Sequence, residues 1–567
     1  MQIVQIDKFL GKLLGFTGAF TTIFIISSNV TDPVNVTKLV AIGVLGFAAL
    51  ATVFTTQLVK AFLFYKPVVI AIAVFVLLMI LGVFTSEAPV TQVLYGSYGR
   101  NNGLLAYVFL SAIFLSALVL KVRQSFLSII NALVIAGVVN LIYCLWVIAF
   151  GDFIGWTNPY GNILGTLGNP NFIGAFLGII FSTLVALSLN QNSSLLGRIL
   201  SACGLPICAF EIIKSHAIQG RVVAAFGSAV VLFLFIRSKF NKTVLIGYTL
   251  LSVILGASAL AGALQIGPLT KYIYKTSVSL RGQYWLAGWN TGQEHPFTGV
   301  GMDTFGDWYR RMRDPHALEL PGVNTVVNAA HNVPIDIFAF GGWPLFVTYL
   351  SIMGIAGLSI IKMIKRRKSY DLILVVFAAA WAGYQLQSII SINQIGLAVW
   401  GWLLSGAVIA YERLTQNSGV ENTETEVIGK KIKAKPKNSL PAQVPLYATA
   451  GGLVGLLIAL PPLTADAKWR SSQVARTIPA LQEAMTSTYF NPPNSMKYQN
   501  TVQTLEGSQL FDLAHKYALE AVNWNPNAFE LWKVLYLIKN STPAERDEAL
   551  KNMKRLDPLN PDVTATK

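Results

Sequence analysis

Ionisable side chains gather in one polar stretch, residues 266–342, of an otherwise apolar chain. It is the longest polar interruption between hydrophobic runs in the first 410 residues. It contains Arg281, Glu294, His295, Asp303, Arg310, Arg311, Arg313 and His331. A histidine titrates near neutral pH and suits proton transfer, and an arginine holds anions through a planar fork of donors. The stretch therefore predicts most of an active site, with proton transfer and anion binding as its chemistry.

Composition places this stretch at a membrane. Of 567 residues, 53% are hydrophobic and 12% are charged, whereas globular chains carry about 25% charged residues. The net charge of +16 matches the excess of Lys and Arg that membrane proteins carry in cytoplasmic loops, so we expect no nucleic-acid partner. The three cysteines lie in apolar segments and indicate neither a disulfide framework nor a zinc site. The first apolar stretch lacks a small-residue cleavage site and predicts a retained span.

Thirteen apolar runs are long enough to cross a hydrocarbon core of ~30 Å as helices. They lie near 10–28, 37–59, 67–85, 104–120, 126–150, 171–189, 198–213, 219–236, 243–263, 332–361, 371–390, 394–412 and 443–463. Basic residues between them alternate as the positive-inside rule expects. We therefore predict an all-α, polytopic helical bundle with about twelve core spans plus one more. Its N-terminus is cytoplasmic, and the loop at 266–331 and the C-terminal tail are external.

The elements that position the polar side chains follow from local pattern. The segment LRGQYWLAGWNTGQEHPFTGVG predicts a short amphipathic helix and a turn. Its aromatic face, expected to lie on the membrane, consists of Leu280, Tyr284, Trp285 and Trp289. Arg281 would then stand at the helix start, where backbone N–H groups help to hold an anion. Gly299 and Gly301 predict a tight turn.

Two further external loops are rich in turn-forming residues. LYGSYGRNNG carries Arg100, and Asn169-Pro170-Asn171 predicts a turn or a helix start. Arg221 lies at the external mouth of the eighth run, where an arginine either faces a polar cavity or snorkels to the interface. By position alone, a lone interfacial histidine such as His331 is more often structural than catalytic.

Five segments in order carry a family resemblance. They are YGSYGRNNGLLAYVFL, TLGNPNFIGAFLGIIF, QGRVVAAFGSAVVLFL, SLRGQYWLAGWNTGQEHPFTGVGMDTF and AAHNVPIDIFAFGGWPLFVTYL. Over residues 1–415 the chain resembles the O-antigen ligase and O-antigen polymerase superfamily of bacterial membrane glycosyltransferases. The resemblance implies a GT-C-like bundle whose external loop caps a cavity for a lipid-linked sugar donor.

The resemblance also implies a reaction and its residues. The donor would be a glycan on undecaprenyl diphosphate, at the outer leaflet of the cytoplasmic (inner) membrane, with no cofactor. Arg221 and Arg281 would stabilise the departing diphosphate, and His331 would act as base toward the acceptor hydroxyl or position it. The segment IQGR departs from the SRG form often seen around the first arginine, which affects the local register. The expected substrate-binding residues are Arg100, Asn332, Tyr284, Trp285, Arg310 and Arg311.

A metal-independent mechanism is the accompanying hypothesis. The external loops contain no DxD-like pair of carboxylates. Arginines concentrated on the external face would then balance the diphosphate in place of a divalent cation.

The remaining chain divides by composition. We predict a membrane core at 1–412 that includes the external loop 264–331, a cytoplasmic linker at 413–442, an added span at 443–463 and an external helical domain at 464–567. The last domain is similar to tetratricopeptide repeats, because Pro526 and Pro558 end two units near the family period of about 34 residues. It would form a groove for a partner protein or acceptor, or a small cap on the bundle.

Three classes of function compete. A glycosyltransferase would move the lipid-linked glycan to a lipid, protein or glycan acceptor. A transporter should spread ionisable groups through its spans, whereas here they crowd one loop. A scaffold acting through its tail would leave Arg221, Arg281 and His331 unexplained. Within the favoured enzyme class, ligase, polymerase and protein O-oligosaccharyltransferase share the donor, and the added tail slightly favours a separate acceptor.

Overall fold

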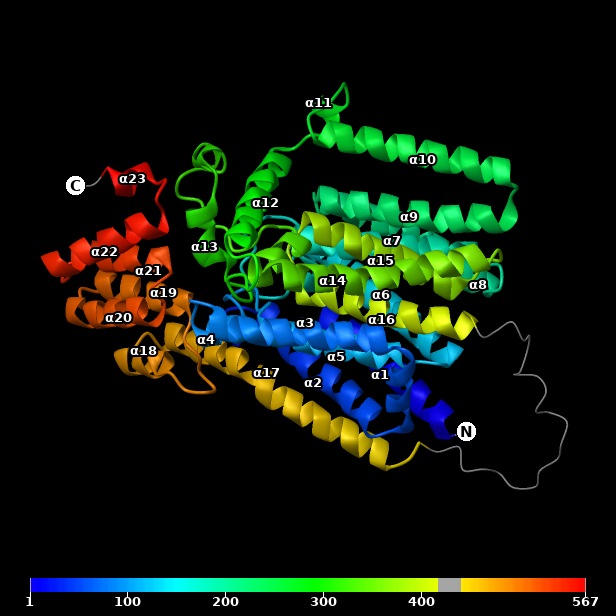
Figure 1. The fold of residues 1–567 in the computed structure, drawn as a ribbon, viewed down its shortest axis with the longest axis horizontal. Coiled ribbons are helices and arrows are strands. Elements are labelled where there is room, and N and C mark those ends of the chain that lie inside the picture. Colours follow the sequence, from blue (N-terminus) through cyan, green and yellow to red (C-terminus); the bar gives the residue numbers. More distant parts are fainter. Residues whose placement is uncertain (1, 417–439, 566–567) are drawn as a thin grey trace.

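The computed structural model describes residues 2–416 and 440–565. Figure 1 shows a bundle of long helices with a group of shorter helices at one end. Thirteen helices overlap the thirteen predicted runs, and eleven of those described are long and apolar enough to span a membrane. α1 and the shorter α5 complete the set. The bounds are α1 Gln2–Ile23, α2 Asn35–Phe54, α3 Lys66–Thr85, α5 Leu104–Leu118, α6 Arg123–Phe150, α7 Pro170–Leu189, α8 Leu195–Lys214, α9 Ile218–Lys239, α10 Lys242–Ala263, α14 Val333–Arg366, α15 Leu372–Ile390, α16 Ile395–Gln416 and α17 Gln443–Ala475. The all-α polytopic bundle predicted from the sequence is confirmed.

Burial ranks the helices from the centre of the bundle to its rim. α16 is 94% buried along its most apolar window, whereas none of the corresponding window of α10 is buried. The indole of Trp400 on α16 donates to Thr22 Oγ1 on α1 at 2.8 Å. α17, which follows in sequence, packs along α2, where Gly43 and Gly455 leave no room for a Cβ between the two backbones. Small residues at such a contact are typical of helix packing in membranes.

The first helix differs from its predicted position, 10–28. It spans Gln2–Ile23, because its polar residues Lys8 and Lys12 are helical and the apolar window alone starts too late. At the other end, the ammonium of Lys38 donates to the carbonyls of Thr21 and Thr22, at 2.9 and 2.7 Å. A cation satisfies the unpaired carbonyls at a helix C-terminus.

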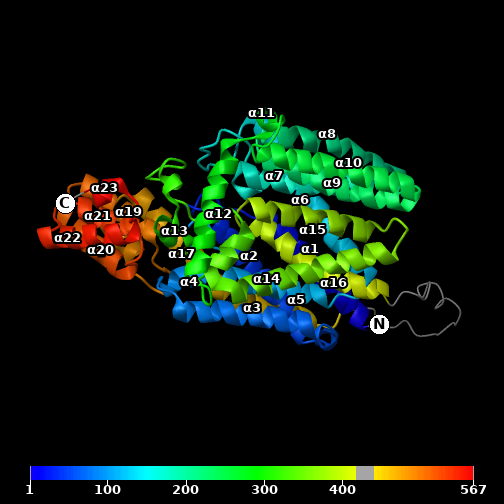
Figure 2. The ribbon, with the colours of Figure 1, turned by 45° about the horizontal axis from the view of Figure 1, so that its top comes forward.

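Two helices of the polar loop, α12 Thr276–Glu294 and α13 Phe305–Met312, lie between the bundle and the C-terminal helices (Figure 2). The loop also contains α11 Thr270–Ile273 and the 3₁₀ turn η3 Pro315–Leu318. The predicted amphipathic helix is therefore present. Because α12 begins at Thr276, however, Arg281 stands in its second turn, and the prediction that it sits at the helix start is wrong.

α14 is broken near its N-terminal end. Gly341 and Gly342 leave helical geometry, with φ/ψ of −142°/16° and 63°/−163°. The predicted glycine turn fills the break: the N–H groups of Val300 and Gly301 donate to the carbonyls of Ala339 and Phe340, each at 3.0 Å. Gly299 has φ +62°, and a Cβ there would collide with the backbone of α14. A two-turn segment therefore separates His331 from the long part of α14, where the sequence predicts one continuous span.

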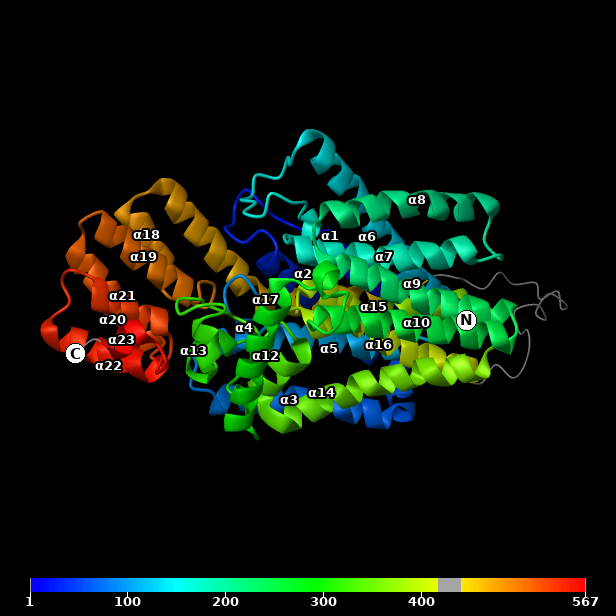
Figure 3. The same cartoon turned by 90° about the horizontal axis from the view of Figure 1, so that it is seen from above.

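The C-terminal helices share a core of their own. They are α18 Ile478–Met485, α19 Ser495–Gly507, α20 Phe511–Trp524, α21 Phe529–Leu537, α22 Pro543–Leu556 and α23 Pro561–Thr564. Ala514, Ala518 and Ala521 are buried in it, as their spacing indicates. Figure 3 shows the group beside α12, α13 and the end of α17. The tetratricopeptide resemblance and a partner protein stay predictions, and the predicted linker at 413–442 falls largely outside the described residues.

Candidate active site

His331 is held directly before α14, facing α12. Its backbone is left-handed, with φ 58°, and Asn332 caps the helix by accepting from the Ile335 N–H at 3.1 Å. The Asp336 carboxylate accepts from the Ala330 N–H at 2.6 Å and closes the turn from the other side. These bonds fix the histidine without engaging its ring, which forms no hydrogen bond within the described parts of the chain.

Two aromatic residues of α12 pack on this histidine. The Tyr284 ring lies 5.5 Å from the imidazole, centroid to centroid, with the planes inclined by 33°. Trp285 Nε1 donates to the His331 carbonyl at 3.4 Å. One turn further along, Trp289 packs on Phe338 at 4.9 Å. Tyr284 also packs edge-on against Tyr309 of α13 at 6.0 Å, so its ring is partly engaged within the protein. That this face lies on the membrane stays a prediction.

Positive charge surrounds the imidazole. Burial, together with the charges of Arg100 and Arg281, lowers the pKa of His331 to about 3, so the ring is neutral in the resting protein. Burial also lowers the pKa of both arginines. Neither guanidinium forms a hydrogen bond or an ion pair with any described residue. Half-buried cations without a partner are costly in an isolated protein, and such perturbed groups mark functional sites.

Asp303 holds the loop that carries Arg100. Its carboxylate accepts from the N–H groups of Ser97 and Asn102, at 2.8 and 3.2 Å, and its carbonyl accepts from the Ser97 hydroxyl at 2.7 Å. Gly96, Gly99 and Asn101 have positive φ, which confirms the predicted turns. Burial raises the pKa of Asp303 to about 7 despite these bonds and the nearby Arg100. The turn at residues 96–102 therefore fixes Arg100 relative to the polar loop.

A polar cavity of about 490 Å³ opens beside Arg100. Arg470 from α17 lines it as a second cation. The Gln394 side-chain nitrogen, which lines it as well, is buried without a hydrogen-bond acceptor among the described residues. Tyr160 and Asn169 complete a hydrogen-bonding wall, with the Asn169 amide donating to the Tyr160 hydroxyl at 3.0 Å. Two cations and a free amide donor suit an anionic, polar ligand.

Arg221 lies apart from this group. It is exposed near the start of α9 and has no hydrogen bond or ion pair to any described residue. It is not among the charges that act on His331. Of the three predicted catalytic residues, the structure brings Arg281 and His331 together, and the charge of Arg100 acts on His331 as well. The catalytic role of Arg221 stays a prediction.

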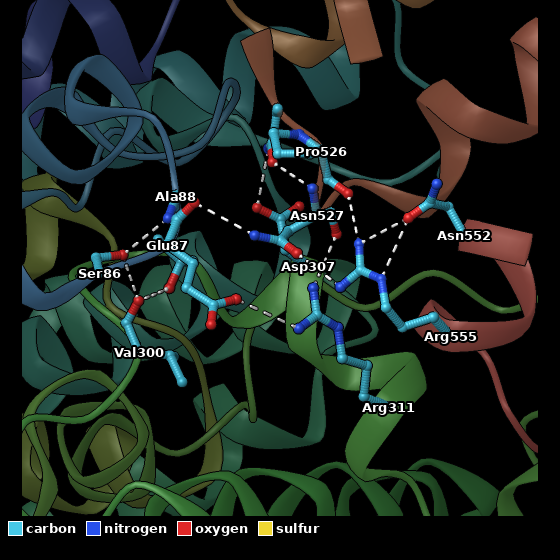
Figure 4. A network of polar contacts seen from close by, with 12 residues as sticks. Ser86, Glu87, Ala88, Val300, Asp307, Arg311, Pro526, Asn527, Asn552 and Arg555 are labelled. Atoms are coloured by element: carbon cyan, nitrogen blue, oxygen red, sulfur yellow. Dashed lines mark hydrogen bonds and ion pairs between the residues drawn. The ribbon is translucent and has the colours of Figure 1, made fainter. Parts of the chain in front are cut away.

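Other predicted substrate residues have structural partners. Arg310 pairs with Glu530 at 2.7 Å and with Asp557 at 2.9 Å, both from the C-terminal helices. Arg311 lies 3.8 Å from Glu87 and donates to the Asn527 carbonyl at 3.4 Å (Figure 4). Asn332 uses its oxygen as a helix cap. A substrate contact for these residues stays a prediction, and the two arginines already join the loop to the C-terminal helices.

Four residues of the site have no individual role predicted from the sequence. Asp303 and Asp336 are single carboxylates whose backbone partners are set by the fold. Gln394 opens one predicted span and Arg470 follows another, and neither belongs to a polar cluster in the sequence. Only Asp303 gave a signal, since it belongs to the polar stretch and follows the glycine turn.

Comparison with known families agrees with this geometry. Residues 217–350 match the family model described as O-antigen ligase. Over these residues the chain is similar to the O-antigen ligase family. No curated protein matches the chain. The O-antigen ligase match runs from the residue before α9 to the middle of α14, so it contains Arg221, Arg281 and His331 and leaves Arg100 and Arg470 outside. The family indicates a glycosyltransferase-like enzyme that is a multi-pass membrane protein, as the sequence predicts.

Proposed function

We propose that the chain transfers a glycan from undecaprenyl diphosphate to an acceptor at the outer face of the cytoplasmic membrane. The observation that carries this proposal is the pair of half-buried, unpaired guanidinium groups of Arg100 and Arg281 beside the neutral imidazole of His331. Two cations match a diphosphate, and a neutral imidazole can accept a proton. The O-antigen ligase match supports the same class of reaction.

The proposed step forms one bond and breaks another. The acceptor hydroxyl oxygen attacks the anomeric carbon of the first sugar, and the bond from that carbon to the diphosphate oxygen breaks. The hydroxyl proton passes to His331, and undecaprenyl diphosphate leaves as an anion. Arg100 and Arg281 would stabilise the charge that develops on this leaving group, which is where preorganised donors are most effective. Arg470 and Gln394 would hold the polar part of the donor in the cavity next to Arg100.

The identity of the acceptor separates the members of this enzyme class. In a deletion strain, loss of a ligase leaves polymer on undecaprenyl diphosphate, whereas loss of a polymerase leaves single repeat units. Electrophoresis of the lipid-linked pool after mild acid release distinguishes these results. We expect accumulated polymer, because the C-terminal helices beside the site offer a separate acceptor a place to bind. An unchanged lipid-linked pool would contradict the proposed function.

A further inference from the structure

A second cavity lies where the C-terminal helices meet the core. We call it the junction cavity; its volume is about 310 Å³. α13, α17, α19 and α21 contribute to its wall together with α4 (Val90–Tyr95) and the loop that follows α4. Figure 1 shows these elements converging beside the C-terminal group. Small-molecule sites begin at about 300 Å³, so the junction cavity has room for a small polar ligand.

Two residues that line the cavity each have a buried polar atom without a partner. Thr91 Oγ1 and Asn101 Oδ1 are buried and form no hydrogen bond within the described residues, and both residues line the junction cavity. An unsatisfied buried polar atom destabilises a protein by roughly 1–3 kcal/mol. Both oxygens accept hydrogen bonds. A ligand that brings several hydroxyl groups would satisfy them.

The rest of the lining indicates what else the ligand carries. Tyr95, Tyr98, Trp524 and Phe529 supply aromatic surface, and Gln92, Asn328 and Gln499 supply amides. A sugar ring has the matching form, with an apolar face of C–H groups and a rim of hydroxyls. Aromatic side chains combined with a few placed polar groups are the usual composition of a specific small-ligand site.

Charge argues against an anionic ligand. Arg310 is the one cation among the lining residues, and its guanidinium is already paired with Glu530 and Asp557. The Asp307 carboxylate accepts from Gln92 at 2.9 Å and from Asn525 at 3.2 Å, and remains in the wall as an acceptor. The lining therefore disfavours a phosphate and suits an uncharged saccharide.

The junction cavity shares a wall with the polar cavity at Arg100. Tyr98 lines both, and its hydroxyl donates to Asp466 Oδ1 at 2.8 Å. Asp466 Oδ2 accepts in turn from the N–H groups of Thr31 and Asp32, at 2.7 and 2.8 Å. A glycan bound in the junction cavity would thus lie next to the site that we assign to the anionic donor.

We propose that the junction cavity binds a neutral mono- or disaccharide segment of a substrate glycan. That the bound saccharide belongs to a substrate rests on the proposed function; binding of a saccharide does not. The C-terminal helices then form one half of a glycan site, and α4 and the loop after it form the other half.

Photo-crosslinking in the producing cells tests this with the glycan that those cells make. The probe is the full-length chain with p-benzoylphenylalanine in place of Gln499, which lines the junction cavity. Lys516, whose side chain is 61% exposed on α20, takes the same probe as the control. We expect a light-dependent adduct at position 499 that yields sugar fragment ions in mass spectrometry, and none at position 516. An adduct with protein or lipid alone, or no adduct at 499, overturns the proposal.

A side-chain change then tests the unpaired oxygens. Thr91→Val keeps the shape of the side chain and removes Oγ1. It should lower the sugar adduct at position 499 about fivefold, which corresponds to the loss of one hydrogen bond. Its thermal stability should be unchanged or higher, because an unsatisfied hydroxyl is lost. Asn101→Gly tests the second oxygen at a position with φ 54°, which glycine adopts without strain. An undiminished adduct in both variants contradicts the proposal.

The same measurement in a His331→Asn background separates the two proposals. We expect the sugar adduct to persist while glycan transfer is lost. If transfer survives the His331 change and the adduct is still formed, the proposed catalytic role fails and the saccharide site stands. If transfer is lost and no sugar adduct forms in either background, the saccharide site fails and the proposed function stands.

Discussion

Arg313 and Asp557 form an ion pair of 2.6 Å in which both side chains are fully buried. It joins the polar loop to the last turn before α23, and Arg310 binds the second oxygen of the same carboxylate at 2.9 Å. The Val323 carbonyl accepts from both arginines, at 3.2 and 2.8 Å. The C-terminal helices are therefore fastened to the loop that carries α12 and α13, and their position is set together with that of the candidate site.

Asp557→Asn should release the C-terminal helices from the loop. The change leaves the buried guanidinium of Arg313 without a carboxylate and Arg310 with Glu530 alone, and an uncompensated buried charge destabilises a protein by about 3–5 kcal/mol. We expect faster cleavage by protease after residue 475 and a lower thermal midpoint in detergent. The control is Glu520→Gln on α20, which breaks the exposed pair with Lys516 and should cost at most about 0.5 kcal/mol. Equal behaviour of the two variants would show that the buried pair does not hold the interface.

The partners of these arginines could not be predicted from the sequence. Arg310 and Asp557 are separated by 247 residues, and no local pattern relates them. From the sequence alone, Arg310 and Arg311 are therefore predicted to contact substrate. In the structure their nearest anions are carboxylates of the protein itself. Local signals were more informative: the glycine turn at Gly299 and the cap at Asn169 both lie where the sequence places them.

In the candidate site, too, local features could be predicted from the sequence, whereas contacts between distant residues could not. Arg100 and His331 could be singled out because each is an ionisable residue next to an apolar run, and Arg281 because it belongs to the polar stretch between two runs. Their grouping depends on Asp303, whose backbone partners lie about two hundred residues earlier, at separations of 206 and 201. The break in α14 had a local signal in Gly341-Gly342 and Pro344, which hydropathy alone does not register.

His331→Asn should abolish glycan transfer. Asparagine tolerates the left-handed backbone at φ 58° better than alanine, so the change removes the imidazole with little strain. Loss of a general base typically lowers turnover by about 10²–10⁴-fold. The measurement is transfer by purified enzyme from a lipid-linked donor, with membrane insertion checked on the same preparation. Activity at the wild-type level would remove His331 from the mechanism.

Arg281→Lys should retain part of the activity and Arg281→Met very little. Lysine keeps the charge and loses the planar fork that grips two phosphate oxygens. Removing one donor to a developing oxyanion lowers kcat by about 10²–10³-fold. Lys214→Met is the matched control, because Lys214 is a cation at the C-terminal end of α8 that packs over Phe210. A loss for Lys214→Met as large as for Arg281→Met would indicate a general need for positive charge.

Chelation should leave activity intact. If Arg100 and Arg281 balance the diphosphate, EDTA removes nothing that the reaction needs. Glycan transfer is measured before and after dialysis against EDTA, and again after Mg²⁺ or Mn²⁺ is added. Loss of activity in EDTA and its recovery with either ion would disprove the metal-independent hypothesis.

The pKa of His331 should rise when diphosphate binds. In the resting protein the pKa is lowered to about 3, by burial first and then by Arg100 and Arg281. A bound diphosphate offsets the charge of both arginines, and the imidazolium that forms during transfer then faces an anion. The base would thus become stronger once its substrate is in place.

Histidine-selective NMR in detergent measures this shift, with the His331→Asn spectrum assigning the resonance. Without ligand the ring should stay neutral from pH 8 down to pH 5; with undecaprenyl diphosphate bound, its titration should move upward into that range. The lowered pKa also predicts a stability effect. The unfolded chain binds this proton near pH 6.5 and the folded chain does not, so stability falls as the pH drops from there toward 3. The His331→Asn variant should lack that part of the acid sensitivity. A resonance that titrates near pH 6.5 in the free protein would mean that neither burial nor the two arginines act on His331 as described.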